Sequence, residues 1–405
     1  MSRSVESIRS DFPALTRVEN GYPVAYFDGP GGTQVPTQVA GAITDYLLHH
    51  NANTHWAYPT SSETDAMLEN ARVVFADFFN ATPADVSFGN NTTTITFHIA
   101  RGLARGWKTG DEIIVTEIDH HGNVAPWRAA AKDFGLVVKS VLLDTKSYRL
   151  DMESLAAAIG PRTRLVAINA ASNALGTISD IAAICAMARQ AGALSFVDAV
   201  HYAPHNLIDV RKIGCDFLAC SPYKFYGPHA GALFARSDIV NTLDIPRLEP
   251  APEEAPERLE SGTQNHEGII GSAAAVEYIA SIGGDGGTRR ERLTRAFSTL
   301  HERGEALFAQ LWEGLSTIDG LIIYGPPPGT ARTHTLSFTL RGRDTTSIAK
   351  HLVSHGVYAS NGDFYAATIA KVLGQEAHGF LRTGMACYTT ADEVDRLVRG
   401  VRALV

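Results

Sequence analysis

Lys224 is the residue of this chain whose surroundings most clearly suggest chemistry. It follows the apolar stretch 217–220 and precedes Phe225, Tyr226 and a Gly-Pro turn. Lysine normally keeps its ammonium in water, and desolvation lowers the pKa of that group. The free amine released in this way can form a Schiff base with an aldehyde cofactor. An isolated lysine of this kind more often extends past an aromatic neighbour into solvent, so the interpretation depends on other residues.

Asp198 supplies a second group. It ends the apolar segment 194–198, which is typical of a buried parallel strand. Ligands of open α/β sheets bind outside the carboxyl ends of the strands, where a buried carboxylate needs a cationic partner. A protonated pyridine nitrogen is such a partner, and an Asp together with a lysine Schiff base is the pattern of pyridoxal phosphate sites. As an alternative, an Asp at this position caps the N-terminus of a helix.

Three further segments suit the same ligand. Thr92 and Thr93 follow a short strand and begin a helical pattern, where backbone N–H groups and hydroxyls bind a phosphate. His120 follows the strand 112–116, and its imidazole can stack on a planar ring. Asn173 follows a third strand and can donate to a ring oxygen. Taken singly, these residues have plainer interpretations: a threonine helix cap, a polar surface histidine and a turn-forming asparagine.

The order of these motifs resembles the class V aminotransferase superfamily, in particular its cysteine desulfurase and selenocysteine lyase group. The motifs are Thr92-Thr93, His120-His121, Ser172 to Gly176, Val197-Asp198, Ser221 to Lys224, Ser261 to Thr263 and Arg382. The resemblance extends from Asp11 to Leu397, nearly the whole chain. It implies an α/β fold of the fold-type I pyridoxal-phosphate enzymes, with a mainly parallel seven-stranded sheet in a large domain and a smaller α+β domain.

The resemblance also implies roles for single residues. Lys224 would form the Schiff base with pyridoxal 5'-phosphate and move the Cα proton, Asp198 would contact the pyridine nitrogen, and His120 would stack on the ring. The remaining cofactor contacts would come from Asn173 and His201 at the ring oxygen, and from Thr92, Thr93, Ser221 and Tyr223 at the phosphate. Arg382 would bind the carboxylate of an amino-acid substrate, with His55 and Asn173 as further substrate-binding candidates. Thr263 would reach the cofactor of the neighbouring subunit, so a homodimer is expected.

Tyr365 departs from the pattern of the desulfurases. These enzymes carry a cysteine on a loop of the small domain that accepts sulfur as a persulfide, and Tyr365 occupies its place in the stretch 357–366. A phenol cannot form a persulfide. Ser360 replaces a usual arginine, His201 stands where many desulfurases have Gln, and Tyr223 where they have His. These substitutions leave the identity of the substrate open, whereas the assignment of the cofactor does not depend on them.

The reaction expected from these residues is a β-elimination that cleaves a Cβ–S, Cβ–Se or similar bond without storing sulfur. An aminotransferase or an amino-acid epimerase on the same scaffold is the alternative, because these reactions share the first steps. A degenerate pyridoxal-phosphate-binding protein with a regulatory role is a third hypothesis. The joint presence of Lys224, Asp198 and Arg382 disfavours it.

The elements that must position these residues alternate along the chain. Strands are expected near 86–89, 112–116, 137–141, 165–169, 194–198 and 217–220, with helices near 62–79, 93–105, 124–134, 151–159 and 180–190. This alternation indicates βαβ units and a mainly parallel sheet covered on both faces. After the glycine-rich stretch 283–287, a long amphipathic helix, strands near 320–324 and 334–340 and two helices are expected. We predict an N-terminal segment, 1–30, that packs with the small domain, a large cofactor-binding domain, 31–285, and a small C-terminal domain, 286–405.

Composition agrees with a soluble enzyme. The 405 residues are 45% hydrophobic and 19% charged, enough for a large core. A net charge of −8 without a cluster of Lys or Arg gives no reason to expect a nucleic acid partner. The first residues lack the apolar core of a signal peptide, and no run approaches a membrane span, so a cytoplasmic location without a membrane partner is expected. The four cysteines, without CxxC or Cys-His spacing, are expected to be buried, with neither a disulfide framework nor a metal.

Overall fold

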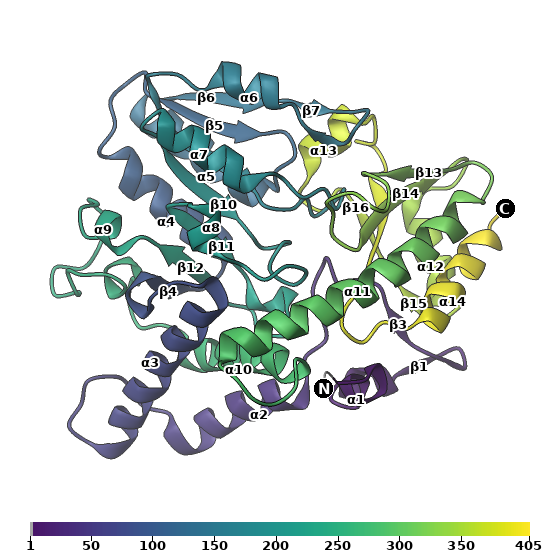
Figure 1. Ribbon diagram of the computed structural model, residues 1–405, viewed down its shortest axis with the longest axis horizontal. Helices are drawn as coiled ribbons and strands as arrows, with labels where there is room; N and C mark the ends of the chain where they lie inside the picture. Colours follow the sequence, from purple (N-terminus) through teal and green to yellow (C-terminus); the bar gives the residue numbers. More distant parts are fainter. Residues whose placement is uncertain (1–2) are drawn as a thin grey trace.

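The computed structural model describes residues 3–405 and contains one large and one smaller sheet (Figure 1). The large sheet has seven strands in the order β4-β12-β11-β10-β9-β5-β6. Their bounds are β4 (Val86–Gly89), β12 (Gly231–Ala235), β11 (Phe217–Cys220), β10 (Leu194–Asp198), β9 (Thr163–Asn169), β5 (Glu112–Thr116) and β6 (Val137–Val141). All neighbouring pairs are parallel except those that involve β12, which is antiparallel to both β11 and β4. The predicted mainly parallel α/β fold is therefore confirmed, and β12 is the strand that the sequence pattern did not indicate.

Helices cover both faces of this sheet because successive strand residues point to opposite sides. Ile114 and Val166 belong to one apolar cluster, whereas their neighbours Ile113 and Leu165 belong to another. The covering helices are α3 (Pro59–Phe79), α4 (Thr92–Ala104), α5 (Ala125–Phe134), α6 (Met152–Ala158), α7 (Ile181–Gln190) and α10 (His266–Ile282), with short α2 (Thr37–Asp45), α8 (Val210–Ile213) and α9 (Ser237–Val240). Helix α10 was not predicted, because apolar residues surround it on all sides and leave no amphipathic period.

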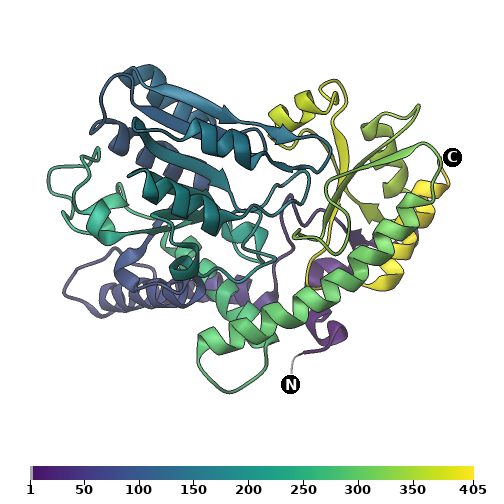
Figure 2. The ribbon, with the colours of Figure 1, turned by 45° about the horizontal axis from the view of Figure 1, so that its top comes forward.

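The smaller sheet has four antiparallel strands in the order β13-β14-β17-β16. They are β13 (Leu321–Tyr324), β14 (Thr335–Leu340), β17 (Phe380–Gly384) and β16 (Ser360–Gly362), accompanied by α11 (Arg289–Ser316), α12 (Thr345–Val353), α13 (Ala367–Val372) and α14 (Ala391–Arg402). The expectation of two helices after residue 340 was wrong, since β16, α13 and β17 lie between α12 and α14. Helix α11 runs from α10 to the small sheet, where it packs on α14 (Figure 2).

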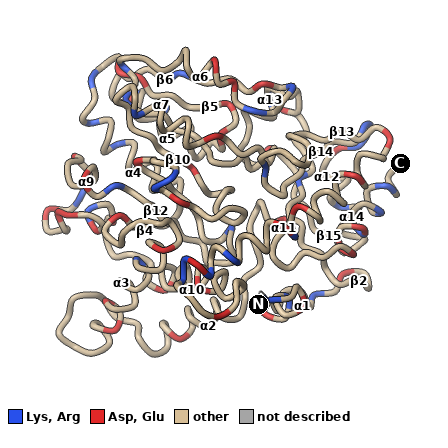
Figure 3. Tube along the Cα trace, in the orientation of Figure 1, with Lys and Arg blue, Asp and Glu red and all other residues tan. Residues whose placement is uncertain are grey.

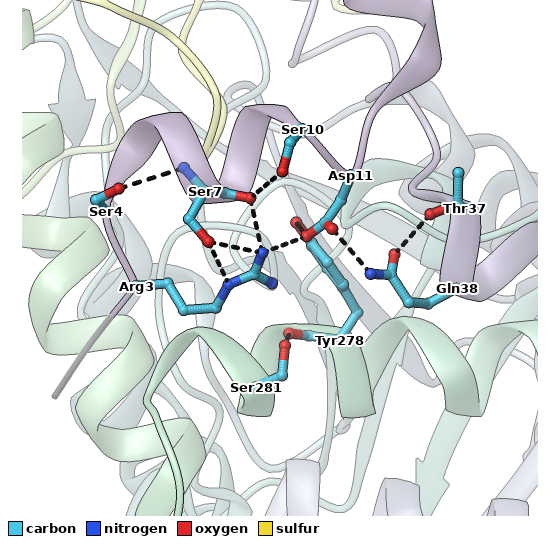
Figure 4. A network of polar contacts seen from close by, with 9 residues as sticks. All are labelled: Arg3, Ser4, Ser7, Ser10, Asp11, Thr37, Gln38, Tyr278 and Ser281. Carbon is cyan, nitrogen blue, oxygen red and sulfur yellow. Dashed lines mark hydrogen bonds and ion pairs between the residues drawn. The ribbon is translucent and has the colours of Figure 1, made fainter.

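The N-terminal residues contact both sheets. Arg3 and Asp11 form an ion pair of 2.7 Å beside α1 (Val5–Arg9), and the Asp11 carboxylate also accepts hydrogen bonds from Tyr278 on α10 and Gln38 on α2 (Figure 4). Further along, β3 (Ala25–Tyr26) pairs in parallel with β15 (Val357–Tyr358) of the smaller unit. Minor two-residue strands complete the fold: β1 (Val18–Glu19), β2 (Tyr22–Pro23), β7 (Leu143–Asp144) and β8 (Arg149–Leu150). The domain boundaries at residues 30 and 285 stay a prediction.

Charged residues of both signs are spread over all parts of the trace (Figure 3). Within residues 3–405, none of the helices combines the length and the apolar character that a membrane crossing requires. The four cysteines are buried, as expected from their apolar neighbours.

An ion pair links α3 to the loop that carries Thr263. The side chains of Arg72 and Glu260 are 9% and 7% exposed and form two hydrogen bonds of 2.8 Å, and the same carboxylate accepts a bond from the Phe88 amide. Glu260→Ala removes both short bonds and leaves the buried Arg72 charge only one ion-pair partner, the partly exposed Glu257, at 3.3 Å, so we expect a loss of about 3 kcal/mol in the free energy of unfolding. Urea denaturation followed by fluorescence and circular dichroism measures it. Asp319→Ala, at an exposed ion pair with Arg341, is the control and should change stability by less than about 0.5 kcal/mol. A similar effect of the two changes would contradict the prediction.

Candidate active site

A cavity of about 680 Å³ lies where the carboxyl ends of the large sheet's central strands meet the smaller sheet. Ten of the predicted site residues line it: Thr92, Thr93, His120, Asn173, Asp198, His201, Ser221, Tyr223, Lys224 and Arg382. Parallel strands end at the same edge, which brings loops distant in sequence together there. None of the four cysteines is among the lining residues.

The amine of Lys224 is buried in this cavity. The residue ends a short 3-10 helix (Pro222–Lys224) directly after β11, and its Nζ donates to the carbonyl oxygens of Pro30 and Gly31. Burial, and next the charge of Arg382, lower the pKa of Lys224 to about 7, while Asp28 and Asp198 act in the opposite direction. A large fraction of the amine is therefore neutral and nucleophilic at neutral pH.

Asp198 is the last residue of β10, and its carboxylate accepts one hydrogen bond, of 2.9 Å, from the Val200 amide. Burial raises the pKa of Asp198 to about 6, against the effects of the Val200 bond and of Lys224. A buried carboxylate with so little compensation fits a cationic ligand group such as a pyridinium. Asp119 received no role from the sequence and lies close enough for the charge of Asp198 to act on it; burial, helped by that charge, holds the pKa of Asp119 well above its usual value.

His120 is neutral in this environment. Its Nδ1 accepts a hydrogen bond of 2.9 Å from the Gly122 amide, which leaves the ring proton on Nε2. Burial and the charge of Lys224 lower the pKa of His120 to about 4. The half-buried ring lies at the cavity wall, with its centroid 5.5 Å from that of Tyr365. A neutral imidazole in this position suits stacking on a planar ring.

One end of the cavity suits an anion. Thr92 begins α4, so the amides of the first turn have no partner within the helix. The hydroxyls of Thr92 and Ser221 lie 2.7 Å apart, and Thr93 also faces the cavity. This end of the cavity fits a phosphate group, because it combines helix-start amides, the positive end of a thirteen-residue helix and three hydroxyls.

Three residues that line the cavity have a buried side-chain atom without a hydrogen-bond partner in the described part of the chain: Asn169, by its Oδ1, and two of the predicted cofactor contacts. The atoms of these two contacts are His201 Nδ1 and Asn173 Oδ1. Burial lowers the pKa of His201 well below its usual value, and its Nε2 lies 3.1 and 3.0 Å from the hydroxyls of Thr333 and Thr335. Buried polar atoms without partners are rare, so these two fit contacts with a ligand such as pyridoxal 5'-phosphate. The Asn173 amide nitrogen donates one of its two hydrogens to the Phe364 carbonyl, which leaves the other for a ring oxygen.

Arg382 comes from the central strand β17 of the smaller sheet and is buried. Its guanidinium donates to the Asn173 carbonyl at 3.1 Å and to the Ser360 hydroxyl at 3.3 Å. Its Cζ also lies 3.8 Å from the ring centroid of Phe364. Burial lowers the pKa of Arg382 to about 10, so the group stays cationic at neutral pH. A buried cation whose partners are mostly neutral suits a carboxylate ligand.

Two predicted residues lie away from this cavity. Thr263 is exposed and lines a different depression, with Asn90, Thr94 and His98 among its neighbours. The side chain of His55 is 82% exposed and pairs with Asp65 at 3.3 Å. Within one chain, neither side chain is among those that line the cavity.

The residues that hold His201 and Arg382 in place lie outside the sequence motifs and were not predicted. Thr333 and Thr335 fix His201, and Phe364 covers Arg382, yet no local pattern indicates any of them. Asp119 could have been recognised from the sequence, because it stands beside His120 in the loop after β5. An acidic residue at a strand exit was the available signal.

Known proteins resemble this chain over its whole length. A family model described as aminotransferase class-V matches residues 25–397. The cysteine desulfurase of Enterobacter sp. (strain 638) is 32% identical over 425 residues, which cover 100% of this chain and 99% of that protein. Among solved structures, the apo cysteine desulfurase of Thermococcus onnurineus NA1 has a TM-score of 0.89 at 27% identity, with coverage of 100% and 99%. The Escherichia coli cysteine desulfurase CsdA has a TM-score of 0.86, also at 27% identity with coverage of 100% and 99%.

The lowered pKa of Lys224 predicts a pH effect on the stability of the cofactor-free protein. Between a native pKa of about 7 and the ordinary value of 10.5, the unfolded chain binds more protons at this site than the native protein. The free energy of unfolding should therefore rise with pH across this interval, by at most about 1.4 kcal/mol per pH unit. Lys224→Met removes this contribution, so the variant should gain stability relative to wild type at pH 7 and lose the difference towards pH 10.

Denaturant titrations at several pH values measure this dependence. Lys212→Met, which removes an exposed lysine, is the control for the loss of one charge. Parallel stability profiles for wild type and Lys224→Met would contradict the prediction.

Proposed function

The chain belongs to the class V aminotransferases, a family of pyridoxal 5'-phosphate-dependent enzymes, and we propose that it cleaves the Cβ–S or Cβ–Se bond of an amino acid by β-elimination. The resemblance drawn from the sequence motifs is thus confirmed at the level of a cysteine desulfurase-like enzyme. The proposal of β-elimination rests mainly on one observation. A buried amine, carboxylate and guanidinium share a cavity that none of the four cysteines lines.

Lys224 is proposed to hold the cofactor and then to move the substrate proton. Pyridoxal 5'-phosphate supplies an electron sink for the negative charge that develops at Cα. The Lys224 amine, with a pKa of about 7, can accept the Cα proton and return it. Asp198 supports a positive charge on the ring nitrogen, and the neutral His120 covers the ring face without adding a competing cation.

Arg382 is proposed to orient the substrate. Its guanidinium binds a carboxylate with two parallel hydrogen bonds, after exchanging its weak bonds to Ser360. Phe364 packs against the other face of the guanidinium and keeps its plane fixed. Arg382 and Lys224 line the same cavity, so an amino acid bound by Arg382 would lie near the Lys224 amine, as proton transfer requires.

The fate of the sulfur follows from the balance of electrons. Formation of alanine from cysteine releases sulfur in the elemental oxidation state, which needs a thiolate to receive it as a persulfide. Elimination instead breaks Cα–H and Cβ–S, releases sulfide with its electron pair and, after addition of water, gives pyruvate and ammonia without any oxidant or reductant. The cysteines are buried, and burial raises the pKa of Cys185 to about 11 and that of Cys387 to about 12. Elimination needs none of them.

The working unit is proposed to be a homodimer in which Thr263 contacts the partner's cofactor. Thr263 is exposed in the loop before α10. The segment 46–58 beside α10 also exposes apolar side chains, including Leu48 and Trp56. Exposed apolar surface next to a polar loop suits an interface between two copies.

The identity of residue 365 should decide which product forms. With cysteine as substrate, we expect the wild-type protein to release equal amounts of sulfide, ammonia and pyruvate without protein-bound persulfide. Tyr365→Cys introduces an exposed thiol beside His120, so it should accumulate persulfide and form alanine. Product assays and mass spectrometry after thiol alkylation measure both outcomes.

Two further variants serve as controls for this experiment. Tyr365→Phe should retain elimination, whereas Lys224→Ala should lose the visible absorption of the cofactor and about 10³-fold or more of the rate. Persulfide and alanine from the wild type would exclude the proposal. A keto acid formed without sulfide, or loss of chirality at Cα, would support the aminotransferase or the epimerase instead.

Mixed dimers test the role of Thr263. A dimer of one Lys224→Ala chain and one Thr263→Val chain keeps a site with both residues intact, and should bind the cofactor there normally. A dimer of wild type and the double variant pairs the only intact Lys224 with Val at position 263 of the partner. Loss of one hydrogen bond to a charged group predicts cofactor binding about 10- to 100-fold weaker in that dimer. Equal affinities, or a monomer in size-exclusion chromatography, would contradict the proposed dimer.

A further inference from the structure

A group of metal-ligand side chains lies outside the cavity, between α11 and the smaller sheet. His301 and Glu305 are one helical turn apart on α11 and face His334, which precedes β14. The candidate ligand atoms of the three side chains all lie within 4.8 Å of one another. Among residues 3–405, this is the one group of three His, Cys, Asp or Glu side chains close enough to share an ion.

The His334 ring packs directly against the backbone of α11, at Gly304. Gly304 lies between the two α11 residues, and a Cβ atom at Gly304 would collide with the His334 imidazole. The glycine therefore lets the buried ring approach the helix. From there His334 Nε2 reaches Glu305 Oε1 at 3.2 Å, and the His301 ring centroid lies 5.6 Å from that of His334.

We propose that His301, Glu305 and His334 bind a divalent transition-metal ion, for which Zn²⁺ is the best match. Two imidazoles and one carboxylate are a common zinc ligand set, and a water completes the tetrahedron. Bond lengths of 2.0–2.2 Å place tetrahedral ligand atoms about 3.4 Å apart, close to the observed His334–Glu305 separation of 3.2 Å. His301 is exposed, so its side chain can turn inward to close the third position. Ca²⁺ and Mg²⁺ prefer ligand sets made of oxygen.

The three-residue metal site is connected to the cavity through the segment 333–335, at the start of β14. The residues on either side of His334, Thr333 and Thr335, hold His201 Nε2 at 3.1 and 3.0 Å. An ion on His334 therefore fixes the backbone that positions His201. This proposal is independent of the reaction proposed above, and it departs from the expectation of no metal. That expectation rested on the absence of CxxC and Cys-His spacing, whereas these ligands come from a helix and from the residue before a distant strand.

Equilibrium dialysis of the chelator-treated holoenzyme, without an affinity tag, against Zn²⁺ tests the site. We expect one zinc per chain by elemental analysis. Loss of residues that merely support metal ligands costs 10- to 100-fold in affinity, so His301→Ala and Glu305→Gln should cost at least about 10-fold. His378→Ala removes an exposed histidine elsewhere on the smaller unit and should leave zinc binding unchanged.

Gly304→Ala gives the sharper comparison, because it keeps all three ligands and obstructs only the approach of the His334 ring to the helix. Alanine also favours the helix, so α11 should remain folded. We expect Gly304→Ala to bind zinc at least 10-fold more weakly than wild type. Zinc should raise the thermal unfolding midpoint of wild type and His378→Ala, but not that of His301→Ala. Absence of bound zinc in wild type, or equal binding in wild type, His301→Ala and Gly304→Ala, would overturn the proposal.

Discussion

The burial of charged groups around one cavity is the constraint on which the rest of the structure depends. Each such group loses hydration and needs compensation from the protein. The Lys224 amine receives it from the carbonyls of Pro30 and Gly31, Asp198 from an amide of its own loop, and Arg382 from the loop after β9 and from the first residue of β16. These partners belong to different parts of the chain. The cavity therefore forms only when the large sheet, the smaller sheet and the N-terminal segment are assembled together.

The same burial brings the two central pKa values close to each other. That of Asp198 rises to about 6 and that of Lys224 falls to about 7, because desolvation penalises the charged form of each. Small changes in nearby charge then decide which protonation states are present. A cationic ring nitrogen beside Asp198 would lower the pKa of this group and fix it as a carboxylate, whereas a phosphate at α4 would meet amides and hydroxyls that do not titrate. Ligand binding and protonation are thus coupled in this site.

Much of the fold and site was predictable from the sequence, because both depend on local patterns. Apolar strands of the large sheet end in polar residues such as Asp198, and helix starts such as Thr92 are marked by their hydroxyls. The strand β12 is apolar but has only five residues and begins with a glycine just after the Gly-Pro turn, and the apolar run of β17 is interrupted by Arg382, so neither was recognised as a strand. The contacts of His201 with two threonines cross between the sheets. Such contacts have no local sequence signal.

In the proposed reaction the fate of the sulfur depends on residue 365, and the backbone geometry of this loop bears on that proposal. Phe364 and Tyr365 have φ values of 58° and 57°, a left-handed conformation that costs aromatic residues about 1–3 kcal/mol each. Three contacts hold it: the His121 amide donates to the Tyr365 carbonyl at 2.8 Å, the Tyr365 amide donates to Asp363 at 3.0 Å, and Arg382 packs on Phe364. None of them involves the Tyr365 phenol, whose residue is 73% exposed. The contacts that hold the loop are therefore independent of the phenol, so an unbranched side chain such as cysteine at position 365 can replace it while the loop keeps these contacts.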